Sequence, residues 1–67
     1  MDRIARLRRR TRRLLGLRVE VELFDGREFE GVLIRVRRNF LVLIRRSKGV
    51  IIRTRIPFRL IEEIERD

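Results

Sequence analysis

The chain has 67 residues, of which 19 are Lys or Arg and 10 are Asp or Glu, and its formal net charge is +9. A chain of this length forms one small domain and buries only about 60% of the surface that its unfolded form exposes. Because it contains neither Cys nor His, disulfides and Cys/His metal sites are excluded, and stability must come from an efficient closed β architecture or from burial against other copies.

The first predicted element is a basic helix over residues 3–15. One narrow apolar stripe runs along it at helical spacing, and Arg residues cover much of the remaining surface. The stripe consists of Ile4, Leu7, Thr11, Leu14 and Leu15. Gly16 follows as a stop signal. We expect this helix to lie on phosphate, and the alternative is a surface helix whose Arg residues are only solvated.

From Leu17 the apolar period changes to two, which predicts strands with one buried face. The first strand ends before Asp25-Gly26, a strong hairpin signal. The returning strand covers residues 27–37. Its Gly31 predicts a bend or bulge that lets a small sheet curl onto itself.

Three more short strands are predicted in the second half of the chain. They cover residues 40–46, residues 50–56 and a last segment anchored by Ile61 and Ile64, with turns at residues 37–39 and 47–49. Pro57 should interrupt the pairing, because it has no backbone N–H. All connections are short, so the sheet must be antiparallel. Residues 1–67 are thus expected to form a single, mainly β domain in which residues 17–65 build a five-stranded, strongly bent, closed or nearly closed barrel.

The charges are segregated along the chain. Residues 1–18 hold eight Arg and one Asp, and residues 31–61 hold nine basic residues and no acid. Nine of the ten acids lie in residues 19–30 and 62–67. This pattern indicates complementary surfaces within or between subunits, with surplus positive charge for a polyanion. Arg, which dominates the basic residues, suits phosphate, although a GC-rich genome or a hot habitat also favours Arg.

Two of the predicted strands are apolar on both faces. Residues 40–44 and 50–52 contain only apolar side chains. One face can fill the barrel, but the other face also needs cover. The N-terminal helix and a neighbouring subunit are the two candidates, and this pattern is the main reason to expect self-association.

Two segments carry motifs of a known superfamily. Residues 16–33 combine alternate apolar positions, the Asp25-Gly26 turn and Gly31 five residues after the turn glycine, and this combination resembles the first Sm motif. Residues 56–64, IPFRLIEEI, resemble the spacing of the second Sm motif. The chain is thus similar to the Sm/LSm/Hfq superfamily over residues 3–65. Its ending looks more like outlying members, such as the C-terminal barrel of the ribosome maturation factor RimP and small Sm-like domains of spore-forming bacteria.

The resemblance implies a bent, SH3-like barrel of five strands, rings commonly of six or seven subunits closed by strand pairing between neighbours, and RNA as the usual partner. The family usually reads a base with an Asp and an Asn in the loop between the second and third strands. The corresponding loop here is Arg37-Arg38-Asn39, so Asn39 alone carries over. The Arg-Gly pair of the second motif falls on Pro57 and Phe58, which departs from the usual uridine pocket.

The composition argues against an enzyme. There is no His, Cys or Tyr, and the hydroxyl residues are Thr11, Ser47 and Thr54, none with a plausible base partner. No cofactor, metal ion or small-molecule substrate is therefore expected, and the acids of residues 62–65 are expected at a solvated strand edge. With only four Phe, binding should be dominated by phosphate contacts.

We expect an Sm-like protein that assembles with itself, as a hexamer or heptamer, and binds RNA or another nucleic acid through Arg–phosphate contacts. The absence of Cys fits the reducing cytoplasm. The residues expected to contact phosphate are Arg8, Arg9, Arg10, Arg12, Arg13, Arg37, Arg38 and Asn39, with Arg45, Arg46 and Lys48 as a second patch.

Two other readings remain open. In the first, the protein is a structural assembly module without nucleic-acid binding, and its acids pair with Arg of the next copy. The acids concerned are Glu20, Glu22, Glu28, Glu30 and those of the C-terminus. In the second, the basic helix docks on an anionic membrane. No membrane partner is expected, because the helix lacks Trp and a wide apolar face.

Overall fold

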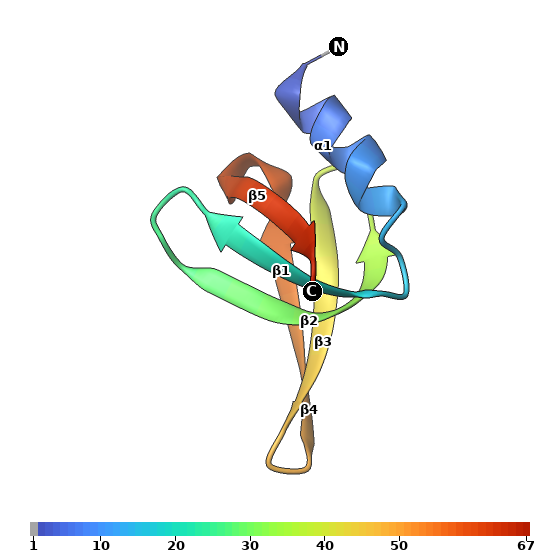
Figure 1. The fold of residues 1–67 in the computed structure, drawn as a ribbon, viewed down its shortest axis with the longest axis vertical. Coiled ribbons are helices and arrows are strands. Elements are labelled where there is room, and N and C mark those ends of the chain that lie inside the picture. Colours follow the sequence, from blue (N-terminus) through green and yellow to red (C-terminus); the bar gives the residue numbers. More distant parts are fainter. Residues whose placement is uncertain (1) are drawn as a thin grey trace.

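The computed structural model of the protein describes residues 2–67, which form one α-helix, five strands and one short 3-10 helix (Figure 1). The elements are α1 (Arg3–Arg12), β1 (Arg18–Leu23), β2 (Glu28–Val36), β3 (Phe40–Ser47), β4 (Val50–Pro57), η1 (Phe58–Leu60) and β5 (Ile61–Arg66). The predicted mainly β fold with an N-terminal helix is confirmed. The first four predicted strands end within one residue of the observed ones.

Helix α1 begins at a side-chain cap and ends earlier than predicted. The Asp2 carboxylate accepts a hydrogen bond from the backbone N–H of Ala5 (2.7 Å), which satisfies one of the free amides of the first turn. The predicted extension to residue 15 is corrected, because the α-helix stops at Arg12. The chain then leaves the helix axis through Gly16, which has a φ of +83° and donates its N–H to a carbonyl of β2. Such a left-handed backbone favours Gly.

The five strands form one antiparallel sheet in the order β4-β3-β2-β1-β5, so the predicted antiparallel arrangement is confirmed. The expected closure into a barrel is corrected. Within residues 2–67, β4 and β5 lie at the two ends of the order and do not pair with each other, so the sheet is bent but open. Pro57 ends β4, and η1 then turns the chain away, because proline has no N–H with which to extend the ladder.

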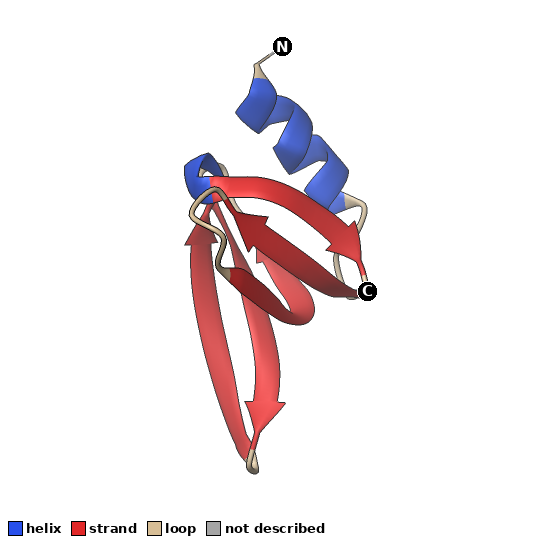
Figure 2. Ribbon diagram, turned by 60° about the vertical axis from the view of Figure 1, so that its left-hand side comes forward, coloured by secondary structure: helices blue, strands red, loops and turns tan. Residues whose placement is uncertain are grey.

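Strand β2 belongs to both halves of the sheet. Its N-terminal part pairs with β1, and its C-terminal part pairs with β3. Between these parts the sheet folds over, so that β5 and β1 face the β3–β4 hairpin (Figure 2). The bend has a steric basis at Gly31, where a Cβ would lie 2.5 Å from the Ile44 carbonyl oxygen of β3. A register shift between Leu33 and Arg35 adds a bulge.

The hydrophobic core lies between the two halves. Its side chains are Leu7, Val19, Val21, Leu23, Leu33, Leu41, Leu43, Ile56, Phe58, Ile61 and Ile64. Helix α1 contributes Leu7 and the buried Thr11, whose hydroxyl donates to the Leu7 carbonyl (2.7 Å). Because these helix side chains join the core, α1 covers the core and not the outer face of β3.

The four Phe differ in burial. Phe58 is fully buried, Phe29 and Phe40 are half-buried, and Phe24 is 59% exposed.

The outer face of β3 is better covered than its sequence suggests. Val42 is only 6% exposed, because Arg35 and Arg55 are its cross-strand neighbours on either side and long Arg stems cover apolar surface. Neither α1 nor another copy is needed there. The uncovered apolar surface of β3 and β4 lies instead at the turn between them, where Val50 and Ile51 are each 61% exposed. Of the two segments predicted to need cover, only the one at residues 50–52 therefore remains a reason to expect self-association.

Gly31→Ala should lower the free energy of unfolding by about 1–3 kcal/mol, the usual cost of overpacking. The added methyl group meets the backbone of Ile44, and a carbonyl in a paired strand cannot move aside without disturbing the ladder. Urea denaturation followed by circular dichroism measures the change. Glu30→Ala, at the neighbouring exposed position, is the control and should change stability by less than about 0.5 kcal/mol. Equal stability of Gly31→Ala and the wild type would contradict the close approach.

Candidate nucleic-acid interface

Helix α1, the turn between β2 and β3, and η1 meet at one end of the sheet (Figure 1). Two adjoining hollows of about 420 and 400 Å³ lie there, and both are lined by Ile4 and Asn39. We call the two hollows together the Arg groove. Five Arg and one Asp line it, so its charge favours an anionic ligand.

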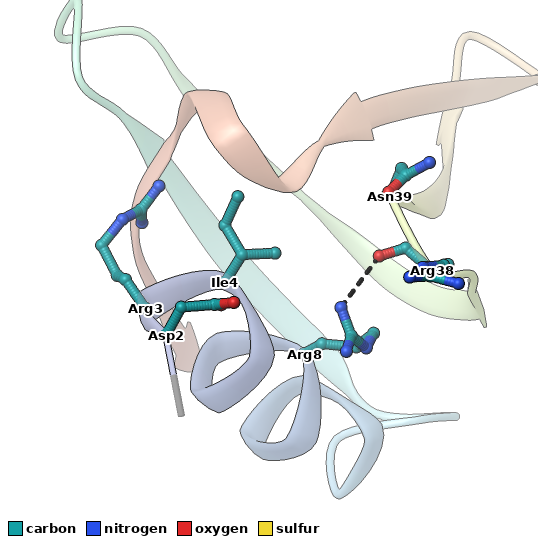
Figure 3. Close-up of a pocket in the computed structure, with 6 residues that line it drawn as sticks. All are labelled: Asp2, Arg3, Ile4, Arg8, Arg38 and Asn39. Atoms are coloured by element: carbon teal, nitrogen blue, oxygen red, sulfur yellow. Dashed lines mark hydrogen bonds between the residues drawn. The ribbon is translucent and has the colours of Figure 1, made fainter.

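The first hollow lies between the start of α1 and the β2–β3 turn (Figure 3). Its lining residues are Asp2, Arg3, Ile4, Arg8, Arg38 and Asn39. The Arg8 guanidinium donates a hydrogen bond to the Arg38 backbone carbonyl (3.1 Å), which joins the helix to the turn. Arg3 donates to the Ile61 carbonyl (2.8 Å) and so fixes the helix to β5. Because a guanidinium has five N–H donors, Arg8 retains donors for a ligand.

The second hollow places an aromatic ring beside Arg side chains. The guanidinium carbon of Arg55 lies 4.3 Å from the ring centroid of Phe40, a cation–π arrangement. Phe58 forms part of the apolar wall, and Arg59 also lines the hollow. The Phe58 backbone N–H donates to the Asn39 carbonyl (2.9 Å), which holds the β2–β3 turn against η1. A planar base can stack on such a ring or guanidinium, and Arg donors suit phosphate.

Asp2 is the one acidic side chain that lines the Arg groove. The hydrogen bond from the Ala5 backbone N–H, together with the nearby positive charge of Arg8, lowers the pKa of Asp2 below its ordinary value. The negative charge of Asp2 therefore interacts with the N-terminus of α1, where an anion is favourable. The groove keeps a net positive charge, because its five Arg outnumber this carboxylate.

The structure brings three of the residues predicted to contact phosphate together in the Arg groove. These are Arg8, Arg38 and Asn39. Five others lie outside its lining. Arg10 forms an ion pair with Glu63 (3.0 Å). The remaining four, Arg9, Arg12, Arg13 and Arg37, are exposed on α1, directly after it or on the β2–β3 turn.

The second predicted patch is far from the groove. Arg45, Arg46 and Lys48 lie at the β3–β4 turn. Figure 1 shows this turn at the opposite end of the molecule from α1, along a longest dimension of 41 Å. The two patches are therefore separate surfaces.

Sequence reasoning did not single out Arg3, Phe40, Arg55 and Arg59 as site residues. For Phe40 and Arg55 a signal exists in the β3–β4 hairpin, whose turn is formed by Lys48 and Gly49 with φ values of +52° and +78°. Once the loop is fixed at two residues, counting back along the strands places Arg55 two positions from the partner of Phe40, on the same face. For Arg3 and Arg59 no local signal exists, because their position depends on how α1 packs against η1.

The residues that the Sm resemblance equates with the pore-lining Arg-Gly pair supply no charge in this chain. Pro57 lines the second hollow, and Phe58 is fully buried. Arg55 and Arg59, which lie close by on either side, carry the charge there instead.

Comparisons with protein-family models, with curated proteins and with solved structures found no match to this chain. Within residues 2–67, no helix is long and apolar enough to cross a lipid bilayer. What the Arg groove binds is therefore inferred from its own side chains.

Asp2→Asn should lower the melting temperature at neutral pH, by an amount that shrinks as the pH falls below the ordinary pKa of an Asp. The folded pKa of Asp2 lies below its ordinary value, so the carboxylate contributes stability above that ordinary value and loses it as the pH falls through the folded pKa. Asn retains a capping oxygen, so the comparison isolates the charge. Thermal unfolding followed by circular dichroism across this pH range measures the difference. Glu62→Gln, an exposed acid of β5, is the control, and an Asp2→Asn effect that does not vary with pH would contradict this account.

Proposed function

We propose that this protein is a non-enzymatic, Sm-like RNA-binding protein that assembles with itself into a ring. The observation that carries the proposal is the Arg groove, where the Arg–aromatic stack of the second hollow adjoins the first hollow, which guanidinium groups line. A base can stack in the second hollow, and a neighbouring phosphate can then meet the guanidinium groups of the first. The net charge of +9 adds long-range attraction for a polyanion.

In the proposed complex, Arg8, Arg38 and Arg59 contact phosphate oxygens, and a base stacks on Phe40 or Arg55. The Asn39 side-chain amide both donates and accepts hydrogen bonds, so it suits a base edge. Several phosphate contacts and few base contacts give weak sequence preference and a steep loss of affinity with salt. Single-stranded RNA is the expected form, because a base must be unstacked to enter the groove.

The open sheet supports the assembly part of the proposal. Strands β4 and β5 end the sheet order, so each presents a backbone edge on which another chain can pair. Pairing β4 of one copy with β5 of the next is a head-to-tail contact, which generates a ring when the rotation closes. The Sm resemblance implies six or seven subunits, each contributing one Arg groove.

A structural assembly module without nucleic-acid binding is the second candidate function. The observation in its favour is a surface of acids on β1, β2 and β5 in a chain that is otherwise basic. We call it the Glu face, and its members are Glu20, Glu22, Glu28, Glu30, Glu63 and Glu65. A double-mutant cycle between the Glu face and an Arg of a neighbouring copy separates the two functions. Strong coupling without RNA affinity favours the structural module.

Protein stripped of nucleic acid should bind labelled single-stranded RNA with an affinity that falls steeply as salt rises. Arg8→Ala and Arg38→Ala should each weaken binding at low salt and reduce the slope of log K against log salt by about 0.7, the value for one phosphate contact on a single strand. Fluorescence anisotropy measures both quantities. Arg66→Ala, which removes the same charge from the end of β5, is the control and should change little. Binding that is absent at low salt, or insensitive to salt, would count against the proposal.

Phe40→Leu tests base stacking separately from charge. Leu keeps the hollow apolar but removes the ring, so the affinity for RNA should fall by about 1 kcal/mol or more, which is roughly fivefold or more. The salt slope should stay at the wild-type value, because no charge changes. Phe24→Leu removes an exposed ring outside the lining of the groove and is the control. Equal losses in the two variants would show that the groove is not where bases stack.

A further inference from the structure

The register of the sheet places the six residues of the Glu face on one outer surface, in two rows. The rows are Glu30–Glu20–Glu65 and Glu28–Glu22–Glu63, with the β1 residue in the middle of each. Directly paired residues project from the same side of a sheet. The alternate residues Val19 and Val21 point into the core and have no exposed surface. The Glu face is therefore two neighbouring rows of three carboxylates.

These carboxylates repel one another in the single chain. Like charges directly opposite each other across strands are destabilising, and the proximity of Glu28 raises the pKa of Glu20. Within residues 2–67, Glu63 is the one member of the Glu face that forms an ion pair, with Arg10. None of the other basic side chains in these residues pairs with the remaining five acids. Cations from outside the chain would relieve this repulsion.

A hollow of about 260 Å³ opens in the Glu face. It is lined by Glu20, Glu28, Glu30 and the half-buried Phe29. The carboxylates do not converge on one point, because within residues 2–67 no group of three acidic side chains is arranged to hold a metal ion. Phe29 is paired with the core residue Val21 and packs against the core, so carboxylates make up the outer surface here, and such a surface suits a group of cations.

The β3–β4 turn carries such a group of cations. We call residues 45–51 the hairpin tip, which contains three basic residues and no acid. Its Val50 and Ile51 are each 61% exposed. Arg46 is paired with Ile51 across the hairpin, so a cation and an apolar side chain leave the same face. The tip projects beyond the rest of the sheet (Figures 1 and 2).

We propose that the hairpin tip of one copy docks on the Glu face of another. The occupant is a second copy because the basic tip matches the acidic Glu face in charge, and because both surfaces stay exposed in the single chain. Arg46 and Lys48 lie against the rows of carboxylates. The inference rests on the self-association in the proposed function and adds a side-chain contact to it. Each tip meets one face, so the contact is head-to-tail and can repeat around a ring.

Charge reversal on each side tests the contact. The tip variant carries Arg46→Glu and Lys48→Glu, and the face variant carries Glu20→Arg and Glu28→Arg, all at exposed positions. On nucleic-acid-free protein at low salt, light scattering should show an oligomer for the wild type and the single-chain mass of 8.2 kDa for either variant alone. An equimolar mixture of the two variants should regain the oligomer, because each tip then meets a face of opposite charge. Circular dichroism verifies that both variants are folded.

Arg12→Glu with Arg13→Glu reverses two charges at the C-terminal end of α1 and is the matched control, which should keep the wild-type mass. The proposal fails if the tip and face variants stay assembled, if their mixture stays at 8.2 kDa, or if the wild type is itself a single chain. Arg8→Ala should lose RNA affinity without losing mass. Failure of RNA binding is therefore distinguishable from failure of the tip contact.

A disulfide cross-link provides a second measurement that does not depend on reversed charges. The chain has no Cys, so a mixture of Ile51→Cys and Glu28→Cys reports this contact alone. Mild oxidation at low salt should yield a covalent dimer of the two variants, and high salt should reduce its yield because the charges are screened. Ile51→Cys mixed with Arg13→Cys is the control and should not cross-link. Absence of the dimer at low salt would overturn the proposal.

Discussion

The fold depends on the close approach of two backbones at Gly31. A chain of 67 residues cannot supply two separate sheets, so a single strand, β2, pairs on both sides and the sheet doubles over along it. The bend brings Gly31 against the Ile44 carbonyl at a distance that no side chain would tolerate. The core lies inside this bend, and α1 only covers its end. The steric limit at one glycine therefore sets how closely the two halves of the sheet approach each other around the core.

The same bend sorts the charges in space. The outer surface of β1, β5 and the start of β2 carries the Glu face, whereas Arg35, Arg53 and Arg55 share the outer surface of β3, β4 and the end of β2. The half with β1 and β5 is built mainly from the acidic blocks of the sequence, and the half with β3 and β4 is built from a basic block. Because the domain is thin, almost every strand has one face in water. Charge blocks along the chain thus become opposite outer surfaces of the molecule.

Local patterns in the sequence were enough to predict the strands but not their exact alignment. The period of two, Asp25-Gly26 and Pro57 placed the strand ends to within a residue. The predicted turn at residues 47–49 did not fix the length of the loop between β3 and β4. A shift of one residue in the pairing of these strands moves every side chain to the other face of the sheet. The contact between Phe40 and Arg55 was therefore not predicted. The dense Arg of α1 predicted a basic surface near Arg8. Which of these Arg residues reach the groove depends on how Leu7 and Thr11 pack, and this is a tertiary property.

The Arg groove and the hairpin tip lie at opposite ends of the molecule (Figure 1), which bears on how assembly and RNA binding would act on each other. Docking a tip on the Glu face pairs carboxylates that otherwise repel RNA, and it leaves the groove free. A single chain therefore presents surfaces of both signs, whereas an assembly presents mainly guanidinium groups. Assembly should strengthen the attraction for RNA, most of all at low ionic strength, and several grooves on one particle add multivalent binding. An RNA that spans two grooves would in turn stabilise the contact between the copies that carry them, because it binds the assembled state more tightly than the single chain.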